Sequence, residues 1–241
     1  MSTLSQILRE DPDLAGSLEG SRLAAAQREI VARTAELRPG AWSPPEDVDG
    51  LRHGIGLLVL EGLLVRRVGL AGRFGAELLG EGDLMRPWQR EDSSSTLPRT
   101  GKWRVLEPTR IAILDTESAV RVSRYPEVIS ELVGRALVRS RHIAVNMAII
   151  HQPRIDVRLH MLFWEHADRW GRVGHDGVRV PLTLTHAMLA ELVAARRPTV
   201  TKALGELAER AAVTWTGDAW LLAGDPPAEL DELGSVSVSA E

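Results

Sequence analysis

Apolar positions along residues 126–150 recur with the seven-residue period of a helix that packs against another helix. Over about three heptads the steps alternate between four and three residues, at Ile129, Val133, Ala136, Ser140, Ile143, Met147 and Ile150. This pattern predicts either a helix packed on its own domain or a parallel dimer helix, and we favour the dimer helix. Ser140 at a seam position would cost stability but help to fix the register. Pro153 ends the run, because a helix interior does not tolerate proline.

The residues before this helix change from a helical to a β-like pattern. Residues 4–38 look helical, with Ser21 as a cap and apolar side chains at three- and four-residue steps up to Ala35. Residues 37–115 hold short apolar runs, such as 56–60, 63–68 and 110–114, separated by many glycines. Short strands with frequent turn residues predict a barrel or jelly roll. The polar stretch 89–99 is predicted to be a mobile loop.

The residues after the long helix predict two hairpins and three helices. A helix is expected over 154–170, a hairpin turns at 174–177, and a second hairpin over 213–222 turns at 216–218. Between the hairpins lie two helical segments. The tail that follows Pro226 and Pro227 is acidic and serine-rich, and it is predicted to be disordered.

The two short helical segments within 182–213 form a helix-turn-helix pattern. Thr185 can cap the first, and the second is expected to start at Pro198, a residue suited to a first helical turn. The second has an apolar face, while its polar and basic residues fall elsewhere, at Arg196, Arg197, Thr199, Thr201 and Lys202. With the hairpin that follows, this predicts a winged helix-turn-helix that reads the major groove. The alternative is a plain helical hairpin whose basic residues form a solvated face.

This segment resembles the DNA-binding domain of the Crp/Fnr transcription regulators. The matching stretches are GVRVPLTLT (177–185), LAELV (189–193) and RPTVTKALGEL (197–207). Weaker resemblance covers DLAG (13–16), LLGEGDL (78–84) and the long helix. The resemblance as a whole implies an α+β fold. Its N-terminal domain, 1–118, would be a double-stranded β-helix (jelly-roll) sensor domain, followed by a dimerisation helix and hinge, 119–152. A C-terminal winged helix-turn-helix, 153–224, and an acidic tail, 225–241, complete the chain.

The resemblance also implies partners and contacts. It implies a homodimer on a pseudo-palindromic site in double-stranded DNA, with RNA polymerase as a further partner. By position, Arg197 would read a base edge such as guanine, and Lys202 would replace a second base-reading arginine. Thr199 would meet a phosphate, and Arg196 the backbone. Pro198 stands where the family often has a glutamate that accepts from cytosine, so the operator should differ from the usual one.

Two further departures concern the turn and the ligand pocket. Ala194 stands where the family's turn often has glycine, and it tolerates a tight turn less easily. Arg86 and Pro87 replace the Gly-Glu pair of members that bind cyclic nucleotides, while two apolar residues replace helix hydroxyls. We therefore expect cyclic AMP not to bind productively. What remains of an effector pocket would be lined by Arg86, Trp88, Arg99, Thr100 and Ile143, although Arg99-Thr100 could equally be a loop end. Trp88 and Trp103, which flank the polar loop, could line an apolar pocket or fill the core.

The composition limits which cofactors, catalytic activities and cellular locations are expected. Cysteine is absent, which excludes disulfides and iron–sulfur clusters, and the seven histidines lack paired ligand spacing, so we expect no haem. No catalytic motif occurs, and an enzyme is not expected. With no signal peptide or membrane-spanning run, we expect a cytoplasmic protein without membrane contact.

The charge distribution leaves two functions open. The net charge of −4 comes from a tail with five acids, and residues 135–180 carry a local +4. The leading hypothesis is a sequence-specific transcription regulator. The alternative is a ligand-sensing regulatory module whose helix-turn-helix serves protein interaction, because residues 185–213 carry a net charge of only +1.

Overall fold

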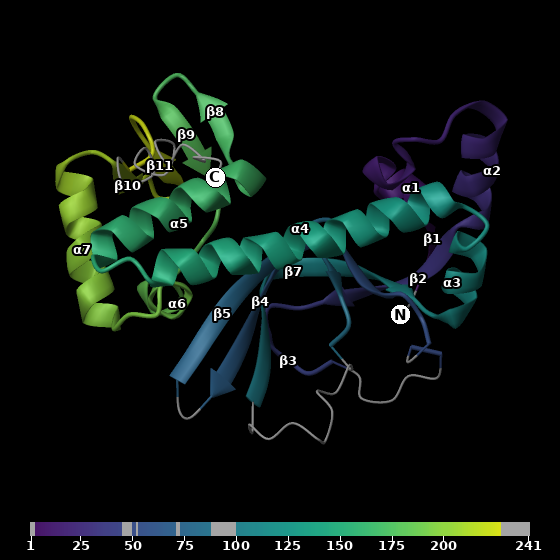
Figure 1. The fold of residues 1–241 in the computed structure, drawn as a ribbon, viewed down its shortest axis with the longest axis horizontal. Helices are drawn as coiled ribbons and strands as arrows, with labels where there is room; N and C mark the ends of the chain where they lie inside the picture. The colour runs from purple at the N-terminus through teal and green to yellow at the C-terminus, as the bar shows by residue number, and fades with distance from the viewer. Residues whose placement is uncertain (1–2, 45–49, 52, 71–72, 88–99, 228–241) are drawn as a thin grey trace, which may run out of the picture. The chain divides into compact units, whose positions relative to one another are not determined.

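The computed structural model describes residues 3–44, 50–51, 53–70, 73–87 and 100–227 (Figure 1). The chain folds into two compact units, Met1–His142 and Ile143–Glu241. The boundary between the units falls inside a long helix, α4 (Pro126–Ile150). Among the described residues, no helix has the length and apolar character needed to cross a membrane. The polar stretch at 89–99 and most of the acidic tail lie outside the described residues.

The first unit is built on an antiparallel sheet of seven strands. Its main path has the order β1-β2-β7-β4-β5, while β3 pairs with β7 and β6 with β4. The strands are β1 (Thr3–Gln6), β2 (Val31–Leu37), β3 (Gly40–Trp42), β4 (Gly56–Leu70), β5 (Arg73–Gly80), β6 (Leu84–Met85) and β7 (Thr100–Leu114). The β-rich segment predicted from the sequence is therefore confirmed.

Strand β4 is apolar throughout its first half because both of its faces are covered. Leu58 and Leu60 belong to one buried cluster, which also includes residues of the neighbouring helices. Leu57 and Val59 belong to a second cluster on the other side of the strand. Successive side chains of a strand point to opposite faces, so a continuous apolar run supplies both clusters.

The helical prediction for residues 4–38 is wrong over much of its length. Helices α1 (Ile7–Glu10) and α2 (Gly20–Glu29) and the 3₁₀ turn η1 (Pro12–Ala15) are separated from one another and flanked by β1 and β2. Helix α2 starts at Gly20 after Glu19, so Ser21 is not its cap. Val31 and Ala35 lie in β2, which pairs with β1 on one side and β7 on the other. Pairing with strands distant in sequence overrode the helical spacing.

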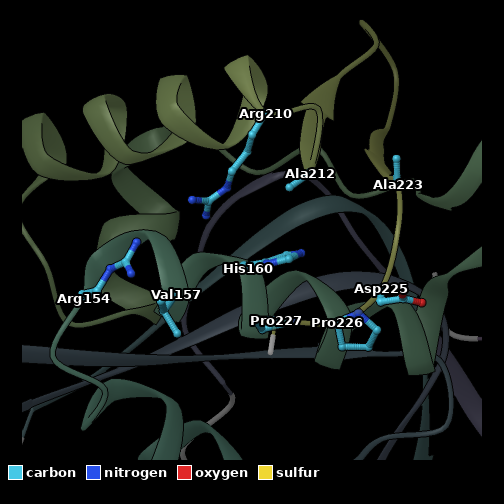
Figure 2. Close-up of a pocket in the computed structure, with 9 residues that line it drawn as sticks. All are labelled: Arg154, Val157, His160, Arg210, Ala212, Ala223, Asp225, Pro226 and Pro227. Atoms are coloured by element: carbon cyan, nitrogen blue, oxygen red, sulfur yellow. The ribbon is translucent and has the colours of Figure 1, made fainter. Parts of the chain in front are cut away.

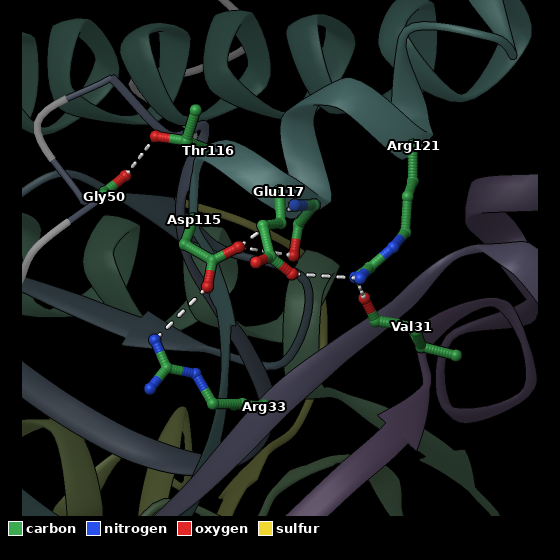
Figure 3. A network of polar contacts seen from close by, with 8 residues as sticks. Val31, Arg33, Gly50, Asp115, Thr116, Glu117 and Arg121 are labelled. Carbon is green, nitrogen blue, oxygen red and sulfur yellow. Dashed lines mark hydrogen bonds and ion pairs between the residues drawn. The ribbon is translucent and has the colours of Figure 1, made fainter.

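Helix α3 (Thr116–Val122) is tied to β2 by a polar network around its first residue (Figure 3). The Asp115 carboxylate accepts hydrogen bonds from the Ser118 N–H and hydroxyl at 3.0 Å each, and from Arg33 at 3.2 Å. Burial raises the pKa of Asp115, but these hydrogen bonds outweigh burial and hold it below its ordinary value. Arg121 at the other end of the helix donates to the Val31 carbonyl at 3.1 Å. Both ends of α3 thus contact β2.

The Gly-Asp turn suggested by LLGEGDL is present between β5 and β6. Gly82 has a φ of +84°, where any other side chain would be strained. The Gly80 N–H donates to the buried Asp83 carboxylate at 2.8 Å and closes the turn.

Helix α4 has the bounds that its heptad pattern predicts. On its inner side, Val128 and Leu132 join a buried cluster of the first unit. Two arginines on the same helix add ion pairs, Arg135 with Asp11 and Arg139 with Glu77. One face of the helix therefore packs against the first unit, and another face is exposed.

The second unit contains three helices and a four-stranded antiparallel sheet of order β10-β11-β9-β8. Its elements are α5 (Ile155–Trp170), β8 (Arg172–Gly174), β9 (Gly177–Val180), α6 (His186–Leu192), α7 (Arg197–Glu209), β10 (Val213–Trp215) and β11 (Trp220–Leu222). Both predicted hairpins are confirmed, with turns at 175–176 and 216–219.

Candidate nucleic-acid interface

Helix α6 and the turn that follows form the first half of the helix-turn-helix. As predicted, the Thr185 hydroxyl caps α6 by accepting from the Met188 N–H at 3.3 Å. Ala194 in the turn has a φ of +52°, the left-handed conformation that glycine adopts without steric cost. The Ala195 N–H donates to the Ala190 carbonyl at 2.8 Å. The tight turn thus forms with alanine at its strained position.

Helix α7 starts one residue earlier than the sequence predicts. Its first residue is Arg197, and Arg196 is the capping residue. Pro198 sits in the first turn, where the missing N–H has no intrahelical partner in any case. The predicted apolar face is confirmed, since the buried residues of the helix are Val200, Ala203, Leu204 and Leu207.

Outside this buried face, the predicted DNA-contacting residues are exposed at the start of α7: Arg196, Arg197, Thr199, Thr201 and Lys202. The Lys202 side chain is 81% exposed, and its ammonium lies 3.6 Å from Glu206 one turn later. A surface ion pair of this kind is weak and can exchange for a phosphate or base edge. The buried face fixes the helix, and the basic face is available to a partner.

Sequence reasoning missed one residue at this surface, His186, the first residue of α6. Its Nδ1 lies 2.9 Å from the Thr201 hydroxyl and joins α6 to the exposed side of α7. The two residues are fifteen positions apart, so no local spacing signal links them. Only the packing of α6 against α7 brings them together.

Asp156 is a second residue that sequence reasoning missed, and it holds the C-terminal end of α7. Its carboxylate accepts from Arg154 at 2.6 Å, at the start of α5, and from Arg210 at 3.1 Å, just after α7. Burial by itself raises the pKa of Asp156, but these two arginines outweigh burial and hold it below its ordinary value. Asp156 thus joins the start of α5 to the end of α7.

The two arginines also border a cavity of about 340 Å³ (Figure 2). Its lining comes from α5, the end of α7 and the segment after β11, namely Arg154, Val157, His160, Arg210, Ala212, Ala223, Asp225, Pro226 and Pro227. His160 Nε2 already accepts from the Trp164 indole at 3.1 Å. Because both arginines pair with Asp156, the cavity borders the ion pairs that hold the end of α7.

Replacing Asp156 with asparagine should destabilise the second unit by about 1–2 kcal/mol, because two arginines lose a charged acceptor. The folded pKa of Asp156 is lowered, so its contribution is present above the unfolded pKa and is lost as pH falls through the folded pKa. The difference between wild type and Asp156→Asn in thermal unfolding should therefore shrink below about pH 4. Asp218→Asn, at an exposed pair with Arg179, is the control and should change little. An equal loss in both variants would contradict this role for Asp156.

The predicted effector pocket stays a prediction, because most of its side chains lie outside the described residues. Arg86 is exposed after β6, whereas Trp88, Arg99 and the Thr100 side chain fall outside what the structure describes. Ile143 is exposed on α4 and belongs to the second unit. Trp103 packs edge-on against Trp42, with ring centroids 5.7 Å apart, beside a buried cluster. This position agrees with Trp103 as a core residue.

The predicted dimer seam lies on the free side of α4. Large apolar residues on this helix are exposed at Ile129, Val133, Leu137, Val138, Ile143, Val145 and Met147, and Ile150 at the end is half-buried. Ala136 and Ser140 are exposed between them. We call the exposed seam positions from Ile129 to Met147 the α4 stripe. Contiguous exposed apolar side chains of this kind are typical of a surface that binds a partner.

Comparisons with known proteins agree with this geometry. Residues 157–227 match the family described as "Crp-like helix-turn-helix domain". A search of curated protein sequences gave no match. Among solved structures, FixK2 from Bradyrhizobium japonicum superposes with a TM-score of 0.59 at 15% identity, covering 87% of this chain and 99% of that one.

Two further structures show the same fold. A CooA variant from Carboxydothermus hydrogenoformans has a TM-score of 0.59 at 17% identity and covers 92% of this chain and 94% of its own. A transcriptional regulator of the CRP/FNR family from Thermus thermophilus has a TM-score of 0.56 at 22% identity, covering 83% of this chain and 97% of its own. The α+β fold inferred from the sequence is confirmed. Residues 157–227 therefore match a Crp-like helix-turn-helix domain, and the chain as a whole has the fold of the CRP/FNR regulators.

Proposed function

We propose that this regulator binds a pseudo-palindromic operator as a homodimer, with α7 of each protomer in the major groove. The observation that carries the proposal is the division of α7 into a buried apolar face and an exposed basic one. A recognition helix needs both, since one face fixes its orientation on the protein and the other contacts DNA. RNA polymerase is the further partner that regulation of transcription would require.

The exposed residues of α7 divide between base and phosphate contacts. Arg197 is proposed to read a guanine edge, with Lys202 as the second base-reading cation, because these side chains match acceptors in the major groove. Thr199 and Arg196 lie at the start of the helix and would contact the DNA backbone, and Thr201 is adjacent to Lys202. Pro198 has no side-chain donor or acceptor, so the base that it faces is not read by a hydrogen bond.

The α4 stripe supports the homodimer. Exposed apolar side chains in an a/d pattern match a second copy of the same helix, which offers an identical stripe across a two-fold axis. A symmetric protein explains a palindromic operator, because two recognition helices then meet two half-sites about one helical turn apart.

We propose that cyclic AMP does not control the regulator. Ile143, aligned with a family position that offers a hydroxyl to adenine, has no hydrogen-bonding side chain, and Arg86 stands in place of a glycine. When a site lacks the side chains that hydrogen-bond the polar groups of cyclic AMP, it loses affinity for that ligand. Control by another small molecule, a protein partner or abundance of the regulator itself fits these residues better, and no cofactor is proposed.

A mobility-shift assay on a palindrome selected from random DNA tests the proposed function. We expect a salt-sensitive shift that is lost when about five base pairs, half a helical turn, are inserted between the half-sites. The insertion keeps every base contact but turns the half-sites to opposite faces of the duplex. Equal binding to the original and the lengthened site would contradict a symmetric dimer, and no binding would favour a protein-interaction role for the helix-turn-helix.

A further inference from the structure

We propose that His186 is a DNA-contacting residue whose protonation strengthens operator binding as the pH falls. The inference rests on the proposed function, because it concerns the same face of the helix-turn-helix. His186 is the first residue of α6, and its Nδ1 lies 2.9 Å from the Thr201 hydroxyl on α7. This contact places an imidazole within the predicted DNA-binding surface.

The position of His186 places it where the DNA backbone is expected to pass. Thr201 lies one turn after Arg197 and next to Lys202, on the exposed side of α7. In helix-turn-helix proteins the first helix crosses the phosphate backbone while the second enters the groove. A side chain that joins the start of α6 to the exposed side of α7 therefore lies where the backbone passes.

Protonation changes what both partners of this contact can donate. A neutral imidazole donates through one nitrogen and accepts through the other, whereas the protonated ring donates through both. Protonated His186 can donate Nδ1–H to the Thr201 oxygen and Nε2–H to a phosphate oxygen. In the tautomer whose neutral Nδ1 accepts from Thr201, the Thr201 hydroxyl proton is then free to donate to an acceptor on the DNA. One proton thus adds a cation facing the phosphates and releases a hydroxyl donor on the recognition helix.

The other charged groups on the elements around the pair are carboxylates, guanidiniums and one ammonium. On α6 and α7 these are Glu191, Arg196, Arg197, Lys202, Glu206 and Glu209, and Arg158 of α5 donates to the Val193 carbonyl next to α6. Between about pH 5.5 and 8 histidine is the side chain that ordinarily changes charge. A pH effect on operator binding in this range is therefore expected from histidines, and His186 contacts a predicted DNA-binding residue.

The test measures operator affinity by fluorescence anisotropy at pH 5.5 and pH 8, each over a range of salt concentrations. For the wild-type dimer we expect about tenfold tighter binding at pH 5.5, with a salt dependence steeper by about two ions, one per protomer. His186→Gln can still hydrogen-bond Thr201 but cannot take up the proton, and it should bind with nearly the same affinity at both pH values. His186→Arg carries a permanent charge and should show the steeper salt dependence at both.

His175→Gln is the matched control. His175 is also exposed in the second unit, but it pairs with Asp176 in the β8–β9 turn, away from α7 in sequence and in its contacts. This variant should keep the full pH effect. A wild-type pH effect that persists in His186→Gln, or the absence of any pH effect in wild type, would overturn the inference. Palindrome-dependent binding at pH 8 tests the proposed function separately, and its absence would overturn both.

Discussion

Replacing Arg197 and Lys202 with alanine should abolish operator binding and leave the fold unchanged. A bidentate side-chain contact to a base discriminates by about 1–3 kcal/mol, and the proposed dimer makes each contact twice. Arg197→Ala alone should therefore weaken binding by about 2–6 kcal/mol, or at least about thirtyfold. Both side chains are exposed on α7 and contribute nothing to its buried face, so thermal unfolding should stay close to that of wild type.

A matched control separates this effect from a general loss of positive charge. Arg172→Ala removes an exposed arginine from β8 in the same unit and should reduce affinity only slightly, through weaker long-range attraction. Anisotropy titrations with the palindrome and with a scrambled duplex give the dissociation constants for specific and for non-specific binding. If the Arg197 and Lys202 double variant bound the palindrome as tightly as wild type, α7 would not be the recognition helix.

A double substitution on the α4 stripe, Val133→Asp with Met147→Asp, should convert the proposed dimer to monomers. These side chains are 53% and 56% exposed on one chain, and full burial of a large apolar side chain contributes about 1.5–3 kcal/mol. Each copy loses two such groups and gains two buried carboxylates that face their symmetry mates. We expect the dimer dissociation constant to rise more than about a thousandfold, measured by analytical ultracentrifugation.

The control for the dimer experiment is Val120→Asp on α3. Val120 is 58% exposed, comparable to the stripe residues, but it lies outside α4. This variant should remain dimeric and should bind the palindrome like wild type, whereas the stripe variant should lose palindrome-dependent binding together with dimerisation. A stripe variant that stayed dimeric would place the interface elsewhere.

Local chemistry explains why the second half of the chain was predicted well. Thr185 caps a helix through its own hydroxyl, Pro198 fits a first turn, and Gly217 occupies a hairpin turn with a φ of +101°. Each of these signals acts within a few residues of its position. The apolar period of α4 is equally local, and the helix has the predicted bounds.

The first half was predicted less well because its strands are stabilised by distant partners. Val31–Leu37 has spacing that suits a helix, yet Ala35 pairs with Ile111, 76 positions away. A period in the sequence does not reveal which other strand is available to complete a sheet. The separate α2 helix and the strand β2 therefore follow from the sheet as a whole.

The sequence alone determined the helix-turn-helix, the two hairpins, the long helix and the exposed basic residues of α7, because each depends on neighbouring residues or on one period. Only the tertiary structure decided that Asp156 joins Arg154 to Arg210 and that His186 meets Thr201. These contacts join side chains that are up to 54 positions apart. Hydrogen bonds depend on distance and direction in space, and a chain has no periodic pattern that records them before its helices have packed.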